Sequence, residues 1–160
     1  MPIVLFRVDE RLIHGQVVVG WGERLHMDRI IVVDDELSTS AWEQELYCLG
    51  VPPSVDAAFV SVEEAHRALA DWRDDPRRLV ILLRDVDTLL RLADGEALSG
   101  TEVTLGGLHA APGRQRVLPY LFLSPEDVEA LRAVAATGAS VVARDLPASR
   151  AVPLEELVDA

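Results

Sequence analysis

The residues with the clearest chemical potential in this chain are His14 and Arg11, close to its N-terminus. They follow an apolar run over residues 1–8 that predicts a buried strand, and open α/β sheets bind ligands at the ends of such strands. A neutral imidazole is nucleophilic and can carry a phosphoryl group covalently. Arg11 offers a cation to the phosphate oxygens, and Gly15 lets the backbone approach a ligand closely. The pattern therefore favours a phosphate-handling site at His14 over a histidine that merely faces solvent in a loop.

Other polar side chains could support such a site, and each has a plainer explanation. His109 follows a glycine pair, and it has either a supporting or interface role near the same edge or no role beyond that of a loop residue. Asp34 and Asp35 end the second predicted strand, where acids orient the imidazole or, in the favoured interpretation, cap the next helix. Arg84 follows the most apolar strand, where it adds to an anion site or makes an ordinary surface ion pair. The residues alone leave these alternatives open.

The composition excludes several other classes of function. The formal net charge of -12 argues against nonspecific nucleic-acid binding, which depends on clustered cations that neutralise phosphates. All 15 basic residues are arginine, which excludes a P-loop lysine, Schiff-base chemistry and a lysine general base. The chain has no G-x-G-x-x-G after its first strand, and its 4 histidines show no metal-ligand spacing. We therefore expect no nucleotide, no metal and no organic cofactor.

Length and hydrophobicity predict a cytoplasmic domain. At 160 residues the chain is expected to form one domain, residues 1–160, with a substantial core. No apolar run approaches the ~20 residues of a membrane span, and the N-terminus has no signal-peptide pattern. The single cysteine, Cys48, cannot form an internal disulfide and is expected to pack as a small hydrophobe under a helix.

Apolar runs alternate with helical patterns along the whole chain. Continuously apolar strands separated by helices imply an α/β fold, a single-domain, open, mainly parallel sheet with helices on both faces. Capping patterns at Ser40, Ser61 and Ser124 mark three helix starts. Trp21 and Trp42 are interpreted as packing residues. The predicted strands cover residues 1–8, 29–33, 56–62, 79–83, 102–105, 120–123 and 140–144, and helices are predicted over residues 16–25, 40–49 and 61–71, up to residue 93, over 124–137 and from 153 onward.

Four blocks of the sequence resemble one known family. Residues 7–17, RVDERLIHGQV, look like the R-I/V-D-x-R-L-I-H-G-Q-V signature of the IIB component of the mannose/fructose/sorbose phosphotransferase family. The resemblance continues at residues 33–35 (VDD), at residues 105–109 (LGGLH) with Gly113-Arg114, and at residues 123–127 (LSPED). The blocks stand in the expected order and span nearly the whole chain. The first block is highly specific, and the others support it.

The resemblance implies a role for each of the two leading residues. In that family the histidine of the L-I-H-G block accepts a phosphoryl group from a histidine of the IIA component and passes it to a sugar held by the membrane components. The match assigns this role to His14, with attachment at Nδ1, and makes Arg11 the contact to the phosphoryl group. The activity implied is that of a protein-N(π)-phosphohistidine–sugar phosphotransferase. The implied partners are a IIA donor and the IIC and IID membrane subunits, with this chain cytoplasmic and peripheral to the inner membrane complex.

Two departures from the family limit this reading. The second predicted helix is atypical at residues 41–43, so contacts there are not carried over. The IIA domain that some members carry at their N-terminus is missing, so we expect a separate donor. The alternative function is that of a regulatory phosphocarrier, or a signalling or binding module, in a system without a complete sugar transporter. The sequence names neither the sugar nor the oligomeric state, and a homo-oligomer is left open.

Overall fold

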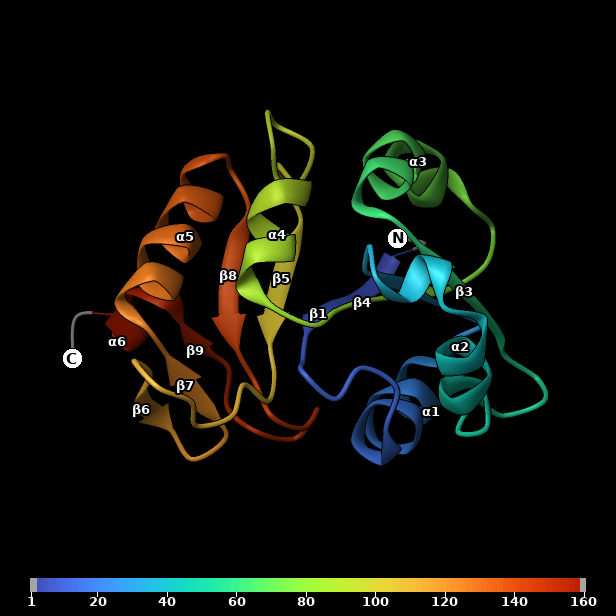
Figure 1. The fold of residues 1–160 in the computed structure, drawn as a ribbon. Coiled ribbons are helices and arrows are strands. Elements are labelled where there is room, and N and C mark those ends of the chain that lie inside the picture. The colour runs from blue at the N-terminus through green and yellow to red at the C-terminus, as the bar shows by residue number, and fades with distance from the viewer. Residues whose placement is uncertain (1–2, 159–160) are drawn as a thin grey trace.

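The computed structural model describes residues 3–158, which form one seven-stranded sheet and a two-stranded hairpin beside it (Figure 1). The strand order in the sheet is β3-β2-β4-β1-β5-β8-β9, and all neighbours are parallel except β8 and β9. The sheet strands are β1 (Ile3–Val8), β2 (Arg29–Val33), β3 (Asp56–Val60), β4 (Leu79–Leu83), β5 (Glu102–Leu105), β8 (Ser140–Ala143) and β9 (Val152–Pro153), and the hairpin pairs β6 (Gln115–Leu118) with β7 (Leu121–Leu123).

Helices cover both faces of this sheet, as the alternating pattern predicts. One core joins the sheet to α3, α4 and α5, and a second core on the opposite face joins it to η1 and the loop before it. Figure 1 shows α4 and α5 together over β5 and β8, and α1 beside α2 at the other end of the molecule. The helical segments are η1 (Gln16–Gly22, a π-helix), α1 (Glu23–Leu25), η2 (Leu37–Thr39, a 3₁₀ turn), α2 (Ala41–Cys48), α3 (Val62–Asp74), α4 (Val86–Leu92), α5 (Pro125–Ala136) and α6 (Leu154–Val158).

Local sequence explains where the main elements form. Every residue of β4 is buried, as expected for a continuously apolar strand between two parallel neighbours, β2 and β1. The capping serines predicted at Ser61 and Ser124 are confirmed, because each hydroxyl accepts the amide three residues on. The side chains of Glu64 and Asp127 return the bond to the serine amides. Both helices therefore begin where their sequences predict.

The prediction of a capping box at Ser40 is wrong. The residue precedes α2, but its side chain makes no capping hydrogen bond. Its amide is bonded to Leu37, which closes η2, and its ψ of 88° is far from the 166° and 163° of the two working caps at Ser61 and Ser124. A 3₁₀ turn immediately before a helix thus removes the extended conformation that a capping serine needs.

The expected burial of Trp42 and Cys48 is also wrong. Trp42 is 65 % exposed and Cys48 is exposed, whereas Trp21 is buried as predicted. The reason is that α2 lies at the margin of its core, which it reaches only with the half-buried Tyr47.

The short strands β6 and β9 carry no strong apolar pattern and were not predicted. The predicted strand at 120–123 pairs with β6 in the hairpin rather than with the main sheet. Met1 and Pro2, the start of the first predicted strand, lie outside the described residues.

The central position of β1 brings separate loops to one edge of the sheet. β1 lies between β4 and β5, so the connections after these strands all leave from the same carboxyl edge. The Asp9 amide bonds the Leu83 carbonyl at 2.8 Å, and the Glu10 amide bonds the Gly107 carbonyl at 2.9 Å. The loop that carries His14 is therefore held between its two neighbours.

Candidate functional site

Asp9 is the centre of the site, at the end of β1. Its side chain is fully buried, and its Oδ1 accepts the amide and the Nε of Arg11, both at 3.1 Å. Oδ2 accepts Arg11 Nη2 at 3.1 Å and the Gly107 amide at 3.1 Å. The His14 Nε2 lies 3.3 Å from the same Oδ2. One carboxylate therefore positions the candidate imidazole, the candidate cation and the loop after β5.

Arg7 lies behind Asp9 and is fully buried within β1. Its Nη2 is 3.3 Å from Asp9 Oδ2, and its two terminal nitrogens donate to the carbonyls of Arg144 and Asp145 at 2.7 and 3.0 Å. The guanidinium also stacks over the Trp21 ring, 5.3 Å from its centroid. Burial lowers the pKa of Arg7, and the charge of Asp9 opposes that shift. The loop after β8 is thereby attached to the site through Arg7.

Asp9 remains ionised despite its burial. Burial by itself raises the pKa of a carboxyl group, because it disfavours the charged form. The contacts from His14 and Arg11, the Gly107 amide and the charge of Arg7 outweigh that effect. Together they hold the pKa of Asp9 well below its ordinary value. The buried carboxylate is thus a fixed negative charge against one side of the imidazole.

His14 is held by its ring and by its backbone. Its carbonyl accepts the amides of Val17 and Val18 at 3.0 and 2.9 Å, so the residue lies at the very start of η1. Leu12 and Ile13 before it are buried in the core, and Leu12 adopts a left-handed φ of 54° that L side chains rarely take. The His14 side chain is only 15 % exposed. Its Nε2 is buried beside Asp9, and the contact does not have the geometry of a hydrogen bond.

Arg11 is anchored but still reaches solvent. Its side chain is 34 % exposed, and its Nη2 also donates to Gln16 Oε1 at 2.9 Å. The glycine pair after β5 makes room for the charged side chains. A Cβ at Gly106 would collide with the guanidinium of Arg7 and the carboxylate of Asp9, and one at Gly107 would lie 3.1 Å from Arg11 Nη2. The LGGLH block is therefore part of the site's packing.

No part of the fold approaches Gly15 closely. A Cβ at this position would meet nothing within 4 Å, and the residue has an ordinary helical φ of -53°. No group of the chain fills this space, and the expectation that Gly15 lets a ligand approach the backbone closely stays a prediction. The space beside the residue is open instead.

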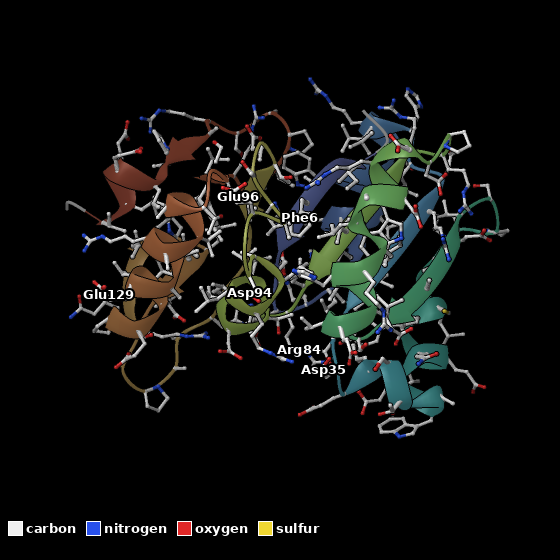
Figure 2. The ribbon with its side chains drawn as sticks, turned by 90° about the horizontal axis from the view of Figure 1, so that it is seen from above. Phe6, Asp35, Arg84, Asp94, Glu96 and Glu129 are labelled. Atoms are coloured by element: carbon white, nitrogen blue, oxygen red, sulfur yellow. The ribbon has the colours of Figure 1, made fainter. Side chains whose placement is uncertain are left out.

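Asp34 and Arg84 form a second pair at the same edge. Asp34 Oδ1 accepts the amide of Leu37, the first residue of η2, at 3.0 Å, whereas the N-cap position itself is Glu36 and makes no capping hydrogen bond. Arg84 Nε lies 3.1 Å from Asp34 Oδ2, and its buried Nη2 has no hydrogen-bond partner among the described residues. Asp35 Oδ1 accepts the amide of Val62 at 2.9 Å. Asp35 and Arg84 are both labelled in Figure 2. Neither aspartate contacts the imidazole of the site within residues 3–158.

His109 belongs to the site only through an intermediate residue. Its Nδ1 lies 3.0 Å from Glu10 Oε2, and its side chain is 60 % exposed. Arg114 bonds both Glu10 and the His109 carbonyl. Glu10 is the residue after Asp9, so the second imidazole lies on the rim of the site while making no described contact with the first.

The sequence-based reasoning missed the residues behind the pair. Arg7, Asp9, Gln16 and Gly107 were not selected, although each contacts Arg11, His14 or their shared carboxylate. A detectable signal existed, because Arg7 is a charge in an otherwise apolar strand and buried charges are paired. Asp9 lies two residues later, on the same face of a strand, and was the natural partner.

Fold and site together define an α/β protein with an imidazole and a guanidinium at the ligand edge of a parallel sheet, both held by one buried carboxylate. Residues 3–160 match the model of the family described as the PTS (phosphotransferase) system sorbose subfamily IIB component, and the chain belongs to that family.

Relatives and solved structures agree with this assignment. The chain is 29 % identical over 158 residues to the mannose-specific EIIAB component of Escherichia coli K12, covering 99 % of this chain but about half, 49 %, of that relative. It is 28 % identical over 147 residues to the fructose-specific EIIB component of Bacillus subtilis 168, covering 92 % of this chain and 90 % of the other. The crystal structure of manxB from Thermoanaerobacter tengcongensis superimposes with a TM-score of 0.83 at 28 % identity, covering 98 % and 95 % of the two chains. Within residues 3–158, no helix is both long and apolar enough to cross a membrane.

Proposed function

We propose that this chain carries a phosphoryl group on His14 Nδ1 within a mannose-type sugar phosphotransferase system. The observation that carries the proposal is the position of the ionised Asp9 carboxylate, 3.3 Å from Nε2. A carboxylate there favours the tautomer with its proton on Nε2, which leaves the lone pair on Nδ1. Nδ1 is then the nucleophile, in agreement with the attachment expected from the family.

The proposed reaction has two transfers. In the first, the Nδ1 lone pair of His14 forms a bond to phosphorus while the phosphorus–nitrogen bond of a donor phosphohistidine breaks, and the donor imidazole leaves with the electron pair. In the second, a sugar hydroxyl oxygen attacks the phosphorus, the Nδ1–phosphorus bond breaks, and the hydroxyl proton passes to a base on the acceptor side or to water. Both are in-line displacements that a protein assists by position and charge.

Arg11 supplies the charge in this proposal. Its Nε and Nη2 are bound by Asp9, while a third of the side chain remains exposed toward a ligand. An arginine held in this way pays little conformational entropy when it meets the phosphoryl oxygens.

The remaining candidates are assigned to the surroundings of the phosphoryl group. The open space at Gly15 leaves room for phosphoryl oxygens beside the first amides of η1. The Arg84 side chain is partly exposed and held by Asp34 at the same edge, and His109 lies on the rim beyond Glu10. We expect each of these residues to tune transfer rather than to carry the phosphoryl group.

The proposed partners follow from the two transfers. The donor is a IIA phosphohistidine protein, and the acceptor is a sugar bound by IIC and IID membrane subunits. This arrangement places the chain on the cytoplasmic side of the inner membrane, where both partners reach His14.

A labelling experiment tests the proposal. Phosphoenolpyruvate, the general phosphotransferase proteins and a IIA component are supplied, and acid-labile phosphate on this chain is measured. Wild type should become labelled and His14→Ala should not, while His109→Ala serves as the matched imidazole control and should label. Equal labelling of wild type and His14→Ala would reject the assignment. Labelled protein that never passes phosphate to sugar in membranes holding its transporter would favour the regulatory function instead.

A further inference from the structure

One helix of the protein presents apolar side chains to solvent instead of to the core. Trp42, Leu46 and Leu49 are 65 %, 57 % and 83 % exposed, and their spacing places them on one side of α2 and its C-terminal end. None of the described residues of α2 is fully buried. These three residues are called the α2 stripe below. A tryptophan and two leucines left in water on one helix face indicate an interaction surface.

The α2 stripe is continuous with the loop that carries His14. A hollow of about 420 Å³ lies between the helix and that loop. Gly50, two residues beyond the helix, lies close to Ile13, the residue directly before His14, because a Cβ at Gly50 would be 3.8 Å from Ile13 Cγ2. Figure 1 shows α2 beside α1, which continues from the same loop. The hollow is lined by Ile13, Trp42, Glu43, Leu46, Tyr47 and Gly50.

The charged residues on α2 and in the turn before it are all acidic. Glu36 and Glu45 are exposed and Glu43 is half-buried, and no ion pair involves them within the described residues. The sequence has no arginine between Arg29 and Arg67. On the side of α2 and the turn before it, the surface is therefore an apolar centre with an acidic rim, which is complementary to an apolar patch with a basic rim.

We propose that the α2 stripe is the docking surface for the protein that phosphorylates His14, and that this donor carries apolar side chains and a basic rim around its phosphohistidine. The proposal rests on the proposed function, because direct transfer between two imidazoles requires the two proteins to meet around His14. The α2 stripe is an apolar surface that reaches that loop.

Two other occupants fit the surface less well. Anionic lipid headgroups repel an acidic rim, which disfavours the membrane face as the partner. A second copy of this chain would bring two acidic rims together and would cover the imidazole that must exchange phosphate. The charge pattern thus selects a basic-rimmed protein.

The test compares a protein donor with a small one. The protein donor is the phosphorylated A component of the Escherichia coli mannose-specific EIIAB relative, and the small donor is phosphoramidate, which needs no docking surface. Trp42→Ser and Leu46→Ser are compared with Leu90→Ser, a matched change at a 37 % exposed leucine on α4. The ratio of protein-donor to phosphoramidate labelling should fall at least about tenfold in both α2 variants, through KM, and stay unchanged in Leu90→Ser.

The outcomes separate the two proposals. Failure of phosphoramidate to label wild type at His14 would reject the proposed function. Two outcomes would overturn the docking surface alone, provided that phosphoramidate labels wild type. One is a ratio of protein-donor to phosphoramidate labelling that stays unchanged in the α2 variants. The other is that the protein donor does not label wild type. A wild-type dimer in sedimentation that Trp42→Ser converts to a monomer would also overturn it, because the occupant would then be a second copy.

Discussion

Two aspartates in this protein hold arginines in the same way at opposite ends of the sheet. Asp9 follows β1 at the carboxyl edge, and Asp75 precedes β4 at the amino edge. In each case Oδ1 accepts both the amide and the Nε of the arginine two residues on, and Oδ2 accepts its Nη2. The six donor–acceptor distances lie between 2.8 and 3.1 Å. An Asp-x-Arg sequence thus makes one local motif wherever the chain turns this way.

The difference between the two motifs lies in what else the carboxylate touches. Asp75 is partly exposed, and its pKa is lowered to about 2 chiefly by the hydrogen bonds from Arg77. Asp9 is fully buried and is shared with Arg7, His14 and the Gly107 amide. The comparison teaches that the local motif supplies an anchored arginine, while the buried contacts make the carboxylate an orienting group for an imidazole.

Removing the buried carboxylate should have the largest effect. Asp9→Ala leaves Arg7 as an unpaired buried charge, so we expect the free energy of unfolding to fall by about 3–5 kcal/mol. The protein should also lose labelling of His14, because its tautomer is no longer set. Urea unfolding measures the free energy, and phosphate labelling of His14 is measured at a temperature where the variant is folded. Asp75→Ala is the control, because it leaves no buried charge without a partner. If it lost as much stability as Asp9→Ala, the two motifs would not differ in the way described.

Removing the anchored arginine should act on rate more than on stability. We expect Arg11→Ala to slow phosphoryl transfer by about 10²-fold, as for the loss of one transition-state donor. Stability should fall by about 1 kcal/mol or less, since the pair is partly exposed. Single-turnover transfer and thermal unfolding measure the two quantities. The matched variant Arg77→Ala should transfer at the wild-type rate; a similar loss there would show that the motif matters only for folding.

Acid should expose the difference between the two carboxylates. Both pKa values lie below the ordinary carboxyl value of about 3.9. The stability that each carboxylate contributes is therefore fully present above about pH 4 and is lost as the pH falls through its folded-state pKa. Carboxyl carbon NMR should give a pKa of about 2 for Asp75, and this pKa should return toward its ordinary value in Arg77→Ala. The pKa of Asp9 should stay low in Arg11→Ala, because the buried partners of the carboxylate remain. A full return of this pKa to its ordinary value would contradict the shared-carboxylate account.

The smallest effect is expected from the glycine that contacts the anchored arginine. In Gly107→Ala the new Cβ lies 3.1 Å from Arg11 Nη2, so the guanidinium must shift by a few tenths of an ångström. We expect transfer to slow by roughly threefold to tenfold, since small misplacements of a catalytic group are felt in the rate. Gly15→Ala is the control for stability, because its Cβ meets nothing within 4 Å. Unchanged transfer in Gly107→Ala would show that the arginine does not need its present position.

Local patterns in the sequence predicted most of the elements and the leading pair of the site. The apolar run of β4 and the serines before α3 and α5 act through neighbours a few residues away in the sequence. These elements can therefore be predicted from local sequence alone. The same reasoning failed at Ser40, where a preceding 3₁₀ turn changes the backbone, and at Trp42, where the helix lies at the margin of the core. Both failures come from packing that no local pattern records.

The sequence by itself determined the parallel α/β fold and the family, because both depend on patterns of residue types along the chain. Only the tertiary structure decided which carboxylate faces an imidazole. That choice depends on β1 lying between β4 and β5, which brings the Gly107 amide from a distant loop to Asp9 and buries Arg7 behind it. Contacts between residues about a hundred positions apart are set by strand order, and strand order is a property of the whole packed sheet.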